Sequence, residues 1–482
     1  MAGGTWSVTD KPVLPGFYMA FRAAATAAIQ PGSRGIAIAP VRAHWGPVRQ
    51  FVDIASEADI AEAFTRAETN GATAYTTLKL ALLGGAKKLL AYRLTDGTEA
   101  TATITLADTT GTPVNVLKLD AKYTGARGNS FKVAVQVNPV DSSKKDLKLF
   151  EGATLLCTFT FAGGSILNAA NAINGDPGNK WIVATKLADG NGTLANVTGA
   201  AMAGGISGLT GVANADYVNA LSDFETRDFN VVFLDGVSDA TLHASVVSWI
   251  ARIRNEGKGV IAVLGGSASD DTASDAVSKA VARSTAFNHE GVVNVGTGGK
   301  LADIVYSSAQ LTSYVAGLIA GQGLSASTTY APAPFEDVTR RWTRAEQEQA
   351  VRGGVFLLIH DGRSVKALRG INSLATLREG QSVGWKKIRT IRVMDSINAD
   401  LQRTAEDSYI GKVNNTEEGR LALIGACKQY MQSLAQAGII EAEGFDVYTD
   451  PDIVPESDQV FLKWEARLTD VMEQIFSTFI VR

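Results

Sequence analysis

Two short apolar runs, Phe229-Asn-Val-Val-Phe-Leu234 and Gly259-Val-Ile-Ala-Val-Leu264, decide the fold of this chain. Continuous apolar runs of this length are typical of parallel strands that are buried on both faces. Between them, apolar residues recur at helical spacing and form one helix face, made of Leu242, Val246, Trp249, Ile250 and Ile253. This strand–helix–strand order predicts a doubly wound α/β domain.

Strands and helices alternate on both sides of these runs. Upstream, strands are predicted at 34–40 and 88–94, and Ser56-Glu-Ala-Asp59 is typical of a capping box that opens a helix. Downstream, the pattern predicts a helix, a strand and a helix at 270–287, 291–295 and 308–320. We therefore expect a mostly parallel sheet with helices on both faces.

The segment from 99 to about 187 has a different pattern. Apolar and polar residues alternate with period two, and turn residues separate the runs at regular intervals. This pattern is typical of antiparallel strands, and it predicts a β-sandwich inserted into the α/β chain. The runs lie at 100–106, 114–119, 131–137 and 154–161.

After a linker rich in Ser, Thr and Pro, the pattern predicts an α+β C-terminal region. It contains a hairpin around Asp361-Gly362, then helices at 386–407 and 416–437, then strands at 460–468 and 475–481. The predicted organisation is an N-terminal arm, an α/β segment, an inserted β-sandwich domain, a central α/β domain and a C-terminal domain with a terminal arm, at 1–30, 31–98, 99–200, 201–335 and 336–482.

Both ends of the chain have the features of exchange strands. Strand-prone segments carry backbone donors and acceptors that must pair, and a neighbouring molecule supplies the partner when the chain's own sheet is full. We expect 460–468 to be the receiving or adjacent strand. The residues predicted to form inter-subunit strands are Gly16, Phe17, Tyr18, Met19, Phe21, Ile475, Phe476, Phe479, Ile480 and Val481.

The composition excludes several function classes. The net charge of −4, with mixed signs, provides no basic field for tight nucleic-acid binding. The two cysteines, Cys157 and Cys427, lie in apolar patterns and are predicted to be core residues of a protein without disulfides. No apolar stretch approaches the roughly 18 residues of a membrane span, so we expect no membrane insertion.

The stretch Trp385-Lys-Lys-Ile-Arg-Thr-Ile-Arg392 is locally basic. At helical spacing, basic, polar and acidic residues share one stripe that begins in this stretch. The stripe is made of Arg389, Arg392, Ser396, Asp400 and Arg403. Because the acidic residue interrupts the stripe, an ion-paired surface between subunits is favoured over a DNA site.

The helix predicted from Thr416 has two different faces. The broad apolar face consists of Leu421, Leu423, Ile424, Cys427, Tyr430, Met431 and Leu434. The opposite face consists of Glu418, Ala422, Gly425, Ala426, Gln429 and Gln432. Small side chains permit close approach by another backbone, so this second face is either a docking surface or plain solvent-exposed surface.

Residues that could carry catalysis or hold a cofactor are few. The four histidines lack metal-ligand spacing, and the glycine-rich pieces at 203–211 and 296–300 lack a Gly-Lys-Ser/Thr phosphate cradle, so neither a metal nor another cofactor is expected. The best catalytic set is Asp235, His243 and Ser267 or Ser269, near the carboxyl ends of predicted parallel strands. It lacks a Gly-x-Ser-x-Gly elbow, and hydrolysis is kept as the alternative to a structural role.

The chain resembles the tail sheath proteins of contractile (myovirus-type) bacteriophages and related phage-tail-like particles, and the resemblance runs nearly end to end. It rests on a series of stretches in this order: 34–40, Trp45-Gly-Pro47, 122–129, 203–208, 314–321, 369–372, 391–396 and 409–421. The resemblance implies a β-sandwich insertion, a central domain of subtilisin-like topology without an active nucleophile, and a C-terminal sheath domain.

The resemblance also implies a function. Subunits of this family form stacked six-membered rings around an inner tube, terminal arms thread into neighbouring subunits, and contraction drives the tube through the bacterial envelope. The expected partners are further copies of the chain, the tail tube protein, the baseplate and the tail terminator, in a virion tail or tail-like particle assembled in the host cytoplasm. A sheath of a cellular contractile injection system is the second alternative. The residues proposed to face the tube are Arg389, Arg392, Arg403, Glu418 and Gln429.

Overall fold

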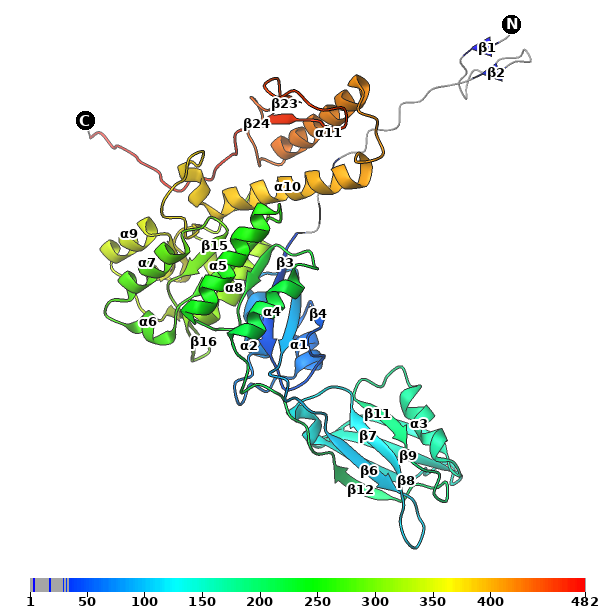
Figure 1. Ribbon diagram of the computed structural model, residues 1–482. Coiled ribbons are helices and arrows are strands. Elements are labelled where there is room, and N and C mark those ends of the chain that lie inside the picture. Colours follow the sequence, from blue (N-terminus) through cyan, green and yellow to red (C-terminus); the bar gives the residue numbers. More distant parts are fainter. Residues whose placement is uncertain (1–2, 5–16, 19–28, 30–31, 33, 482) are drawn as a thin grey trace. The chain divides into compact units, whose positions relative to one another are not determined.

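The computed structural model (Figure 1) describes residues 3–4, 17–18, 29, 32 and 34–481. The chain divides into two compact units, one of Ser33–Arg392 and one of Met1–Gly32 with Val393–Arg482. The larger unit contains a mostly parallel sheet and a β-sandwich, whereas the smaller contains two long helices and a short hairpin.

A seven-stranded sheet forms the centre of the larger unit, in the order β20-β15-β14-β13-β3-β5-β4. All neighbouring strands are parallel except β4 with β5. The strands are β3 (Ile36–Arg42), β4 (Phe51–Ile54), β5 (Lys88–Leu94), β13 (Val231–Phe233), β14 (Ile261–Gly265), β15 (Val292–Val295) and β20 (Val355–Phe356). Most of their side chains are buried, as the continuous apolar runs predict.

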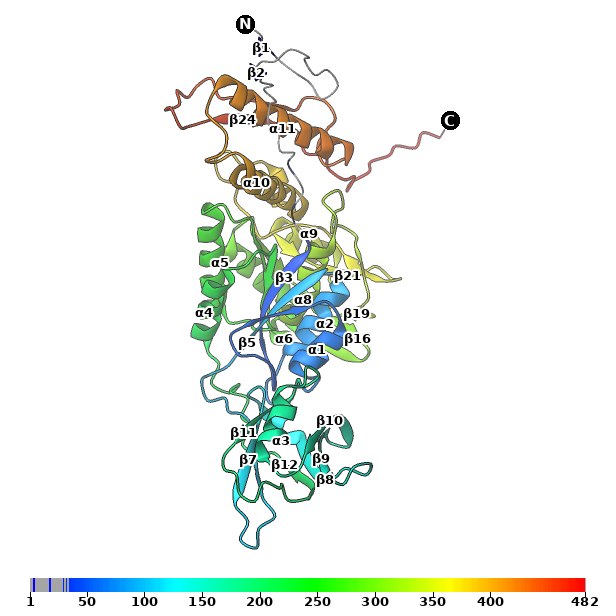
Figure 2. The same cartoon turned by 90° about the vertical axis from the view of Figure 1, so that its right-hand side faces the viewer.

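Helices cover both faces of this sheet (Figure 2). One face carries α4 (Asn214–Phe224), α5 (Ala240–Asn255) and α7 (Ala276–Phe287), which bury Tyr217, Trp249 and Phe287 against it. The other face carries α2 (Ala74–Gly84) and α8 (Ser308–Gly321). Helix α1 (Glu57–Phe64), opened by the predicted capping box, contacts α2, while α6 (Ala268–Thr272) and α9 (Arg344–Arg352) contact α7.

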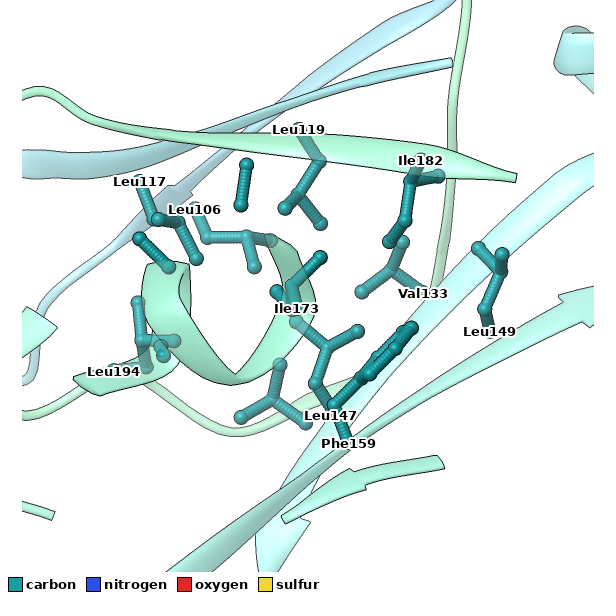
Figure 3. Close-up of a cluster of buried hydrophobic side chains, with 14 of the residues drawn as sticks. Leu106, Leu117, Leu119, Val133, Leu147, Leu149, Phe159, Ile173, Ile182 and Leu194 are labelled. Atoms are coloured by element: carbon teal, nitrogen blue, oxygen red, sulfur yellow. The ribbon is translucent and has the colours of Figure 1, made fainter. Parts of the chain in front are cut away.

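The inserted domain consists of two antiparallel sheets, ordered β10-β9-β8-β12 and β11-β7-β6. Helix α3 (Ile166–Asn174) packs against β10 and β11, and the apolar side chains between the layers form one core (Figure 3). The strands are β6 (Thr103–Ala107), β7 (Asn115–Ala121), β8 (Phe131–Val137), β9 (Lys144–Glu151), β10 (Thr154–Ala162), β11 (Ile182–Lys186) and β12 (Val197–Ala201), with the 3-10 helix η1 (Ala126–Ser130) before β8.

Two small three-stranded sheets complete the larger unit, ordered β17-β16-β19 and β18-β22-β21. Their strands are β16 (Gly299–Leu301), β17 (Ile304–Tyr306), β18 (Pro332–Ala333), β19 (Asp337–Val338), β21 (Leu358–His360) and β22 (Val365–Ala367), and the 3-10 helix η2 (Val383–Lys386) follows. The predicted hairpin around Asp361-Gly362 is thus formed by β21 and β22, whereas β20 joins the central sheet.

Helix α10 (Ile388–Ser408) leads into the smaller unit, where α11 (Glu417–Gln436) precedes the hairpin of β23 (Asp446–Thr449) and β24 (Leu462–Glu465). Near the start of the chain, β1 (Gly3–Gly4) pairs in parallel with β2 (Phe17–Tyr18). The mixed α/β fold with an inserted β-sandwich and a C-terminal domain is therefore confirmed. The predicted domain boundaries stay a prediction.

The predicted helix at 270–287 is one error of the sequence analysis, because two helices, α6 and α7, replace it. Ala273 adopts extended backbone at the end of α6, with a ψ of 151°. Nearby, the Asp271 carboxylate binds the backbone N–H and the hydroxyl of Ser308. This tertiary contact fixes Asp271 and is not visible in the local helical pattern.

Candidate functional site

The C-terminal hairpin forms an incomplete sheet. Val447 in β23 pairs with Trp464 in β24, and α11 contacts β23. Among the residues that the structure describes, this sheet has two strands, so each strand keeps one edge whose backbone groups lack a strand partner. A hairpin of two strands is marginally stable by itself, and additional strands at its edges would complete it.

The tail after this hairpin is an exposed apolar segment. In the described part of the chain, residues 469–481 belong to no helix or strand, although a strand is predicted at 475–481. Phe476 and Phe479 are both 90% exposed. Ile475, Ile480 and Val481 are similarly exposed. A run of apolar side chains in water is unfavourable, and such a surface usually marks an interaction site.

The N-terminal exchange strand is only partly described. Phe17 and Tyr18 form β2, which pairs with Gly3 and Gly4 of the same chain. The other predicted residues of this strand, Gly16, Met19 and Phe21, lie outside the described residues. Pairing of either predicted arm with another subunit therefore stays a prediction.

A buried carboxylate in α10 binds Gly32 and α11 within the smaller unit. Asp400 in α10 is 2% exposed, and its Oδ1 accepts a 2.7 Å hydrogen bond from Gly32 N. Its Oδ2 accepts a 2.6 Å hydrogen bond from the hydroxyl of Tyr430 in α11. One side chain thus connects Gly32 to both long helices, a contact that sequence periodicity does not predict.

The five residues proposed to face the tube have different environments. Arg389 is buried and its Nε donates to Leu324 O, while Arg392 donates to Gln322 O, just beyond the end of α8. These carbonyls lie at a helix C-terminus, where cations are favoured, so both arginines have a structural role. Arg403, Glu418 and Gln429 are exposed.

The faces of α11 differ from the sequence analysis at two positions. Leu421, predicted on the apolar face, is 61% exposed, whereas Ala426, predicted on the small-residue face, is 2% exposed. The remaining exposed residues of this face include Glu418, Gly425 and Gln429. The packed stripe is therefore rotated toward Ala426, because a small side chain permits closer contact with the rest of the unit.

The residues of the hydrolase alternative do not form a catalytic set. Asp235 accepts hydrogen bonds from Arg42, Thr73 and Tyr217. The ring of His243 is buried against Phe287, with Nε2 3.3 Å from Val237 O. Ser267 instead caps α6 by accepting from Asp270 N, with its Oγ 2.9 Å from the Ser269 hydroxyl. These partners differ for each residue, so a Ser–His–Asp hydrogen-bond relay is missing from these described residues.

Two further kinds of site are absent from the described residues. No group of three His, Cys, Asp or Glu side chains has the arrangement needed to hold a metal ion. None of the helices described has both the length and the apolar character of a membrane span.

Comparison with known proteins identifies the class. Three family descriptions match in succession: phage tail sheath protein beta-sandwich domain at 95–207, phage tail sheath protein central domain at 210–373, and phage tail sheath C-terminal domain at 381–482. The fold is thus that of a multidomain sheath protein with an inserted β-sandwich. The chain belongs to the phage tail sheath protein family.

Individual relatives extend the likeness to nearly the whole chain. Phage-like element PBSX protein XkdK of Bacillus subtilis is 28% identical over 486 aligned residues, which cover 94% of this chain and 93% of the relative. The crystal structure of a sheath tail protein from Desulfitobacterium hafniense is 28% identical with a TM-score of 0.73, and the likeness covers 95% of this chain and 98% of that one.

A more distant structure has the same fold. The anti-feeding prophage helical sheath in its contracted state is 13% identical with a TM-score of 0.57, covering 98% of this chain and 99% of that chain.

Proposed function

We propose that this chain is the structural subunit of a contractile tail sheath, which polymerises around an inner tube and contracts to drive the tube through a bacterial envelope. The observation that carries the proposal is the combination of an incomplete two-stranded sheet, β23–β24, with the exposed apolar tail at 475–481. The tail of one copy can add a strand to the two-stranded sheet of a second copy, and that sheet can cover the apolar side chains of the tail.

Strand addition would join the copies. An extended segment that pairs with a sheet edge gains main-chain hydrogen bonds, and its alternate side chains fill pockets of the receiver. The tail at 475–481 and the N-terminal strand at 16–21 are the proposed donors, and β24 with its flanks at 460–468 belongs to the receiver. Because such contacts are heterologous and need not close, they generate a helical tube.

Exchanged strands also explain how a sheath could contract without nucleotide. Strand pairing between subunits can persist while the packed domains rotate, so the strands act as hinges. The extended sheath would be a kinetically trapped state that releases free energy as it contracts. This account agrees with the absence of a phosphate cradle from the sequence patterns at 203–211 and 296–300.

The proposed tube-facing surface is carried by the exposed residues Arg403, Glu418 and Gln429. Charge reversal by Arg403→Glu with Glu418→Lys should abolish decoration of tubes and leave tube-free polymer intact. Arg344→Glu, at a side chain that is 93% exposed on α9, is the matched control and should leave decoration unchanged. Equal decoration by the double variant and the control would contradict this surface.

The remaining parts of the proposal concern partners and place. Besides further copies and the tube protein, we propose a baseplate and a tail terminator as partners, within a virion tail or tail-like particle assembled in the host cytoplasm. A sheath of a cellular injection device would share this architecture. The subtilisin-like order of the central strands stays a prediction, and no observation favours the hydrolase alternative.

The proposal is tested by changing the tail. Purified wild-type chain should form hollow tubes in negative-stain micrographs. Phe476→Asp with Phe479→Asp should leave folded, unassembled chains, because charges in a strand-addition pocket are unfavourable. Val454→Asp is the matched control, since Val454 is equally apolar and 93% exposed but lies in the loop between β23 and β24. Ordered tubes from the double variant would overturn the proposal.

A further inference from the structure

Three stretches that the proposed function leaves unexplained meet at one place in the larger unit. They are 44–47 after β3, 122–129 before β8 and the return segment 203–208. The first belongs to the loop that follows a central strand, the second joins β7 to β8 within the sandwich, and the third follows β12, the last strand of the sandwich. We call their meeting place the joint.

One guanidinium binds all three stretches. Arg93 in β5 is 0% exposed, and its Nη1 donates to Gly46 O (2.7 Å) and Thr124 O (2.8 Å). Its Nη2 donates to Ser207 O (3.2 Å). Burial lowers the pKa of Arg93 to about 10, so the group stays charged at neutral pH and depends on these carbonyls for solvation. The fixed fork of arginine suits three acceptors on separate segments better than a lysine would.

Next to Arg93, the side chain of Trp45 reaches from the α/β part of the unit into the sandwich. Trp45 belongs to the loop after β3, but its side chain is 1% exposed within the core of the sandwich. Its ring lies 5.3 Å from the rings of Tyr123 and Phe131 and 6.3 Å from that of Trp181. The sandwich core is therefore completed by a residue from the α/β part of the unit.

Backbone contacts close the remaining space. Gly125 has a φ of +134°, and a Cβ there would lie 1.9 Å from His44 O, so only glycine fits. His44 Nδ1 lies 2.8 Å from the Ser207 hydroxyl, which also accepts from Ala126 N. The two chain crossings are themselves connected, since Asp96 N donates to Gly208 O.

We propose that the joint locks the β-sandwich to the central α/β domain, so that the two form one rigid lever with Arg93 as its pin and Trp45 as its plug. Two chain crossings alone would permit a hinge, as is usual between domains with small interfaces. Here a buried charge and a shared core each hold the sandwich, so the loss of either should loosen it. The rigidity is a property of the free chain, and its use as a lever in a sheath rests on the proposed function.

The test measures the spread of one distance in the full-length, unassembled chain. Nitroxide labels are placed at Asn171→Cys on α3 and Arg344→Cys on α9, both exposed, with Cys157 and Cys427 replaced by Ala. Double electron–electron resonance should give a narrow distance distribution. Arg93→Lys and Trp45→Leu should each broaden it by at least about twofold, because released domains sample many orientations.

Lys180→Ala is the matched control. Lys180 of the sandwich pairs with Glu62 of α1, but both side chains are more than half exposed, so the distribution should stay narrow. A broad distribution in the parent chain, or an unchanged one in both folded joint variants, overturns the proposal. A variant that does not unfold cooperatively is not properly folded and is left out. The distance distributions of the other variant and of the parent chain then test the proposal. The same narrow distance in assembled tubes supports the lever, whereas a shifted one overturns it. A failure to form tubes would count against the proposed function, while the distance in the unassembled chain would still test the rigid joint.

Discussion

The Tyr430 hydroxyl in α11 donates a hydrogen bond of 2.6 Å to Oδ2 of Asp400 in α10. Both side chains are buried, at 3% and 2% exposure. This bond connects the two long helices of the smaller unit, and the same carboxylate holds Gly32 through its other oxygen. Asp400 therefore connects Gly32, α10 and α11 within the smaller unit.

Tyr430→Phe should lower the free energy of unfolding by about 1–3 kcal/mol, because it removes a hydrogen bond to a buried carboxylate. Urea denaturation followed by circular dichroism measures the change. Tyr448→Phe removes a hydroxyl that donates to Glu465 over the same 2.6 Å, but at an exposed pair, and should change stability by less than about 0.5 kcal/mol. Equal effects of the two substitutions would contradict the role of Asp400.

Asp271 should make the larger unit less stable as pH rises. Burial raises the pKa of Asp271 to about 6, although hydrogen bonds from Ser308 oppose the shift. The folded state then binds a proton more tightly than the unfolded state, so the free energy of unfolding falls between about pH 4 and pH 6. Asp271→Asn mimics the protonated acid and should raise stability at pH 8, by up to about 3 kcal/mol. A variant less stable than wild type at pH 8 would refute this.

His243 should have the opposite effect in nearly the same range. Burial lowers the pKa of His243 to about 4, so the unfolded state binds the proton more tightly. Its contribution to stability is complete above pH 6.5 and is lost as pH falls toward 4. His243→Gln, which can still donate to Val237 O, should show a smaller loss on acidification than wild type. Chemical denaturation at pH 4.5 and 7.5 compares the two, and equal losses would exclude His243 as a contributor.

The central sheet could be predicted because its strands are local apolar runs. The strands at 229–234 and 259–264 are each buried on both faces. A strand of this kind needs apolar side chains at consecutive positions, and such a run is visible in the local sequence. Strand β9 is not predicted from the sequence, because Lys144–Glu151 is rich in charged residues. Lys145 is nevertheless buried, and its ammonium group donates hydrogen bonds to Leu194 O and to the side chain of Asn196. That compensation comes from residues about fifty positions away, which no local pattern contains.

The candidate site was predictable only in part for the same reason. The exposed apolar tail follows from Phe476 and Phe479 in the sequence, whereas the strand predicted there requires a partner that the chain does not supply. Arg389 matched a surface stripe by helical spacing, but the carbonyl of Leu324 draws it into the interior. The joint was not foreseen, because Trp45, Thr124 and Ser207 become neighbours only in the folded unit.

Ser267 should behave as a helix cap and not as a nucleophile. Ser267→Ala removes the oxygen that accepts from Asp270 N, and should cost about 1 kcal/mol of stability. A fluorophosphonate probe should label wild type and variant equally weakly, since His243 binds Val237 O and is not bonded to Ser267. Labelling of the folded wild type that is lost in the variant would instead support the hydrolase alternative.

Close packing of α2 against α8 depends on glycines in both helices. A Cβ at Gly317 would lie 2.0 Å from Ala81 O, and one at Gly84 would lie 2.2 Å from Tyr314 O. Backbone cannot move aside as a flexible side chain can, so the helices must separate to admit a methyl group. This explains the glycine spacing of 314–321, one of the stretches that carry the family resemblance.

Gly317→Ala should therefore destabilise the larger unit by about 1–3 kcal/mol, the usual range for overpacking a core. Gly425→Ala in α11 is the matched control, because nothing lies within 4 Å of its added Cβ. There the better helix propensity of alanine should raise stability by up to about 1 kcal/mol. Thermal unfolding of both variants measures the contrast, and a neutral or stabilising Gly317→Ala would show that α2 and α8 are not held in backbone contact.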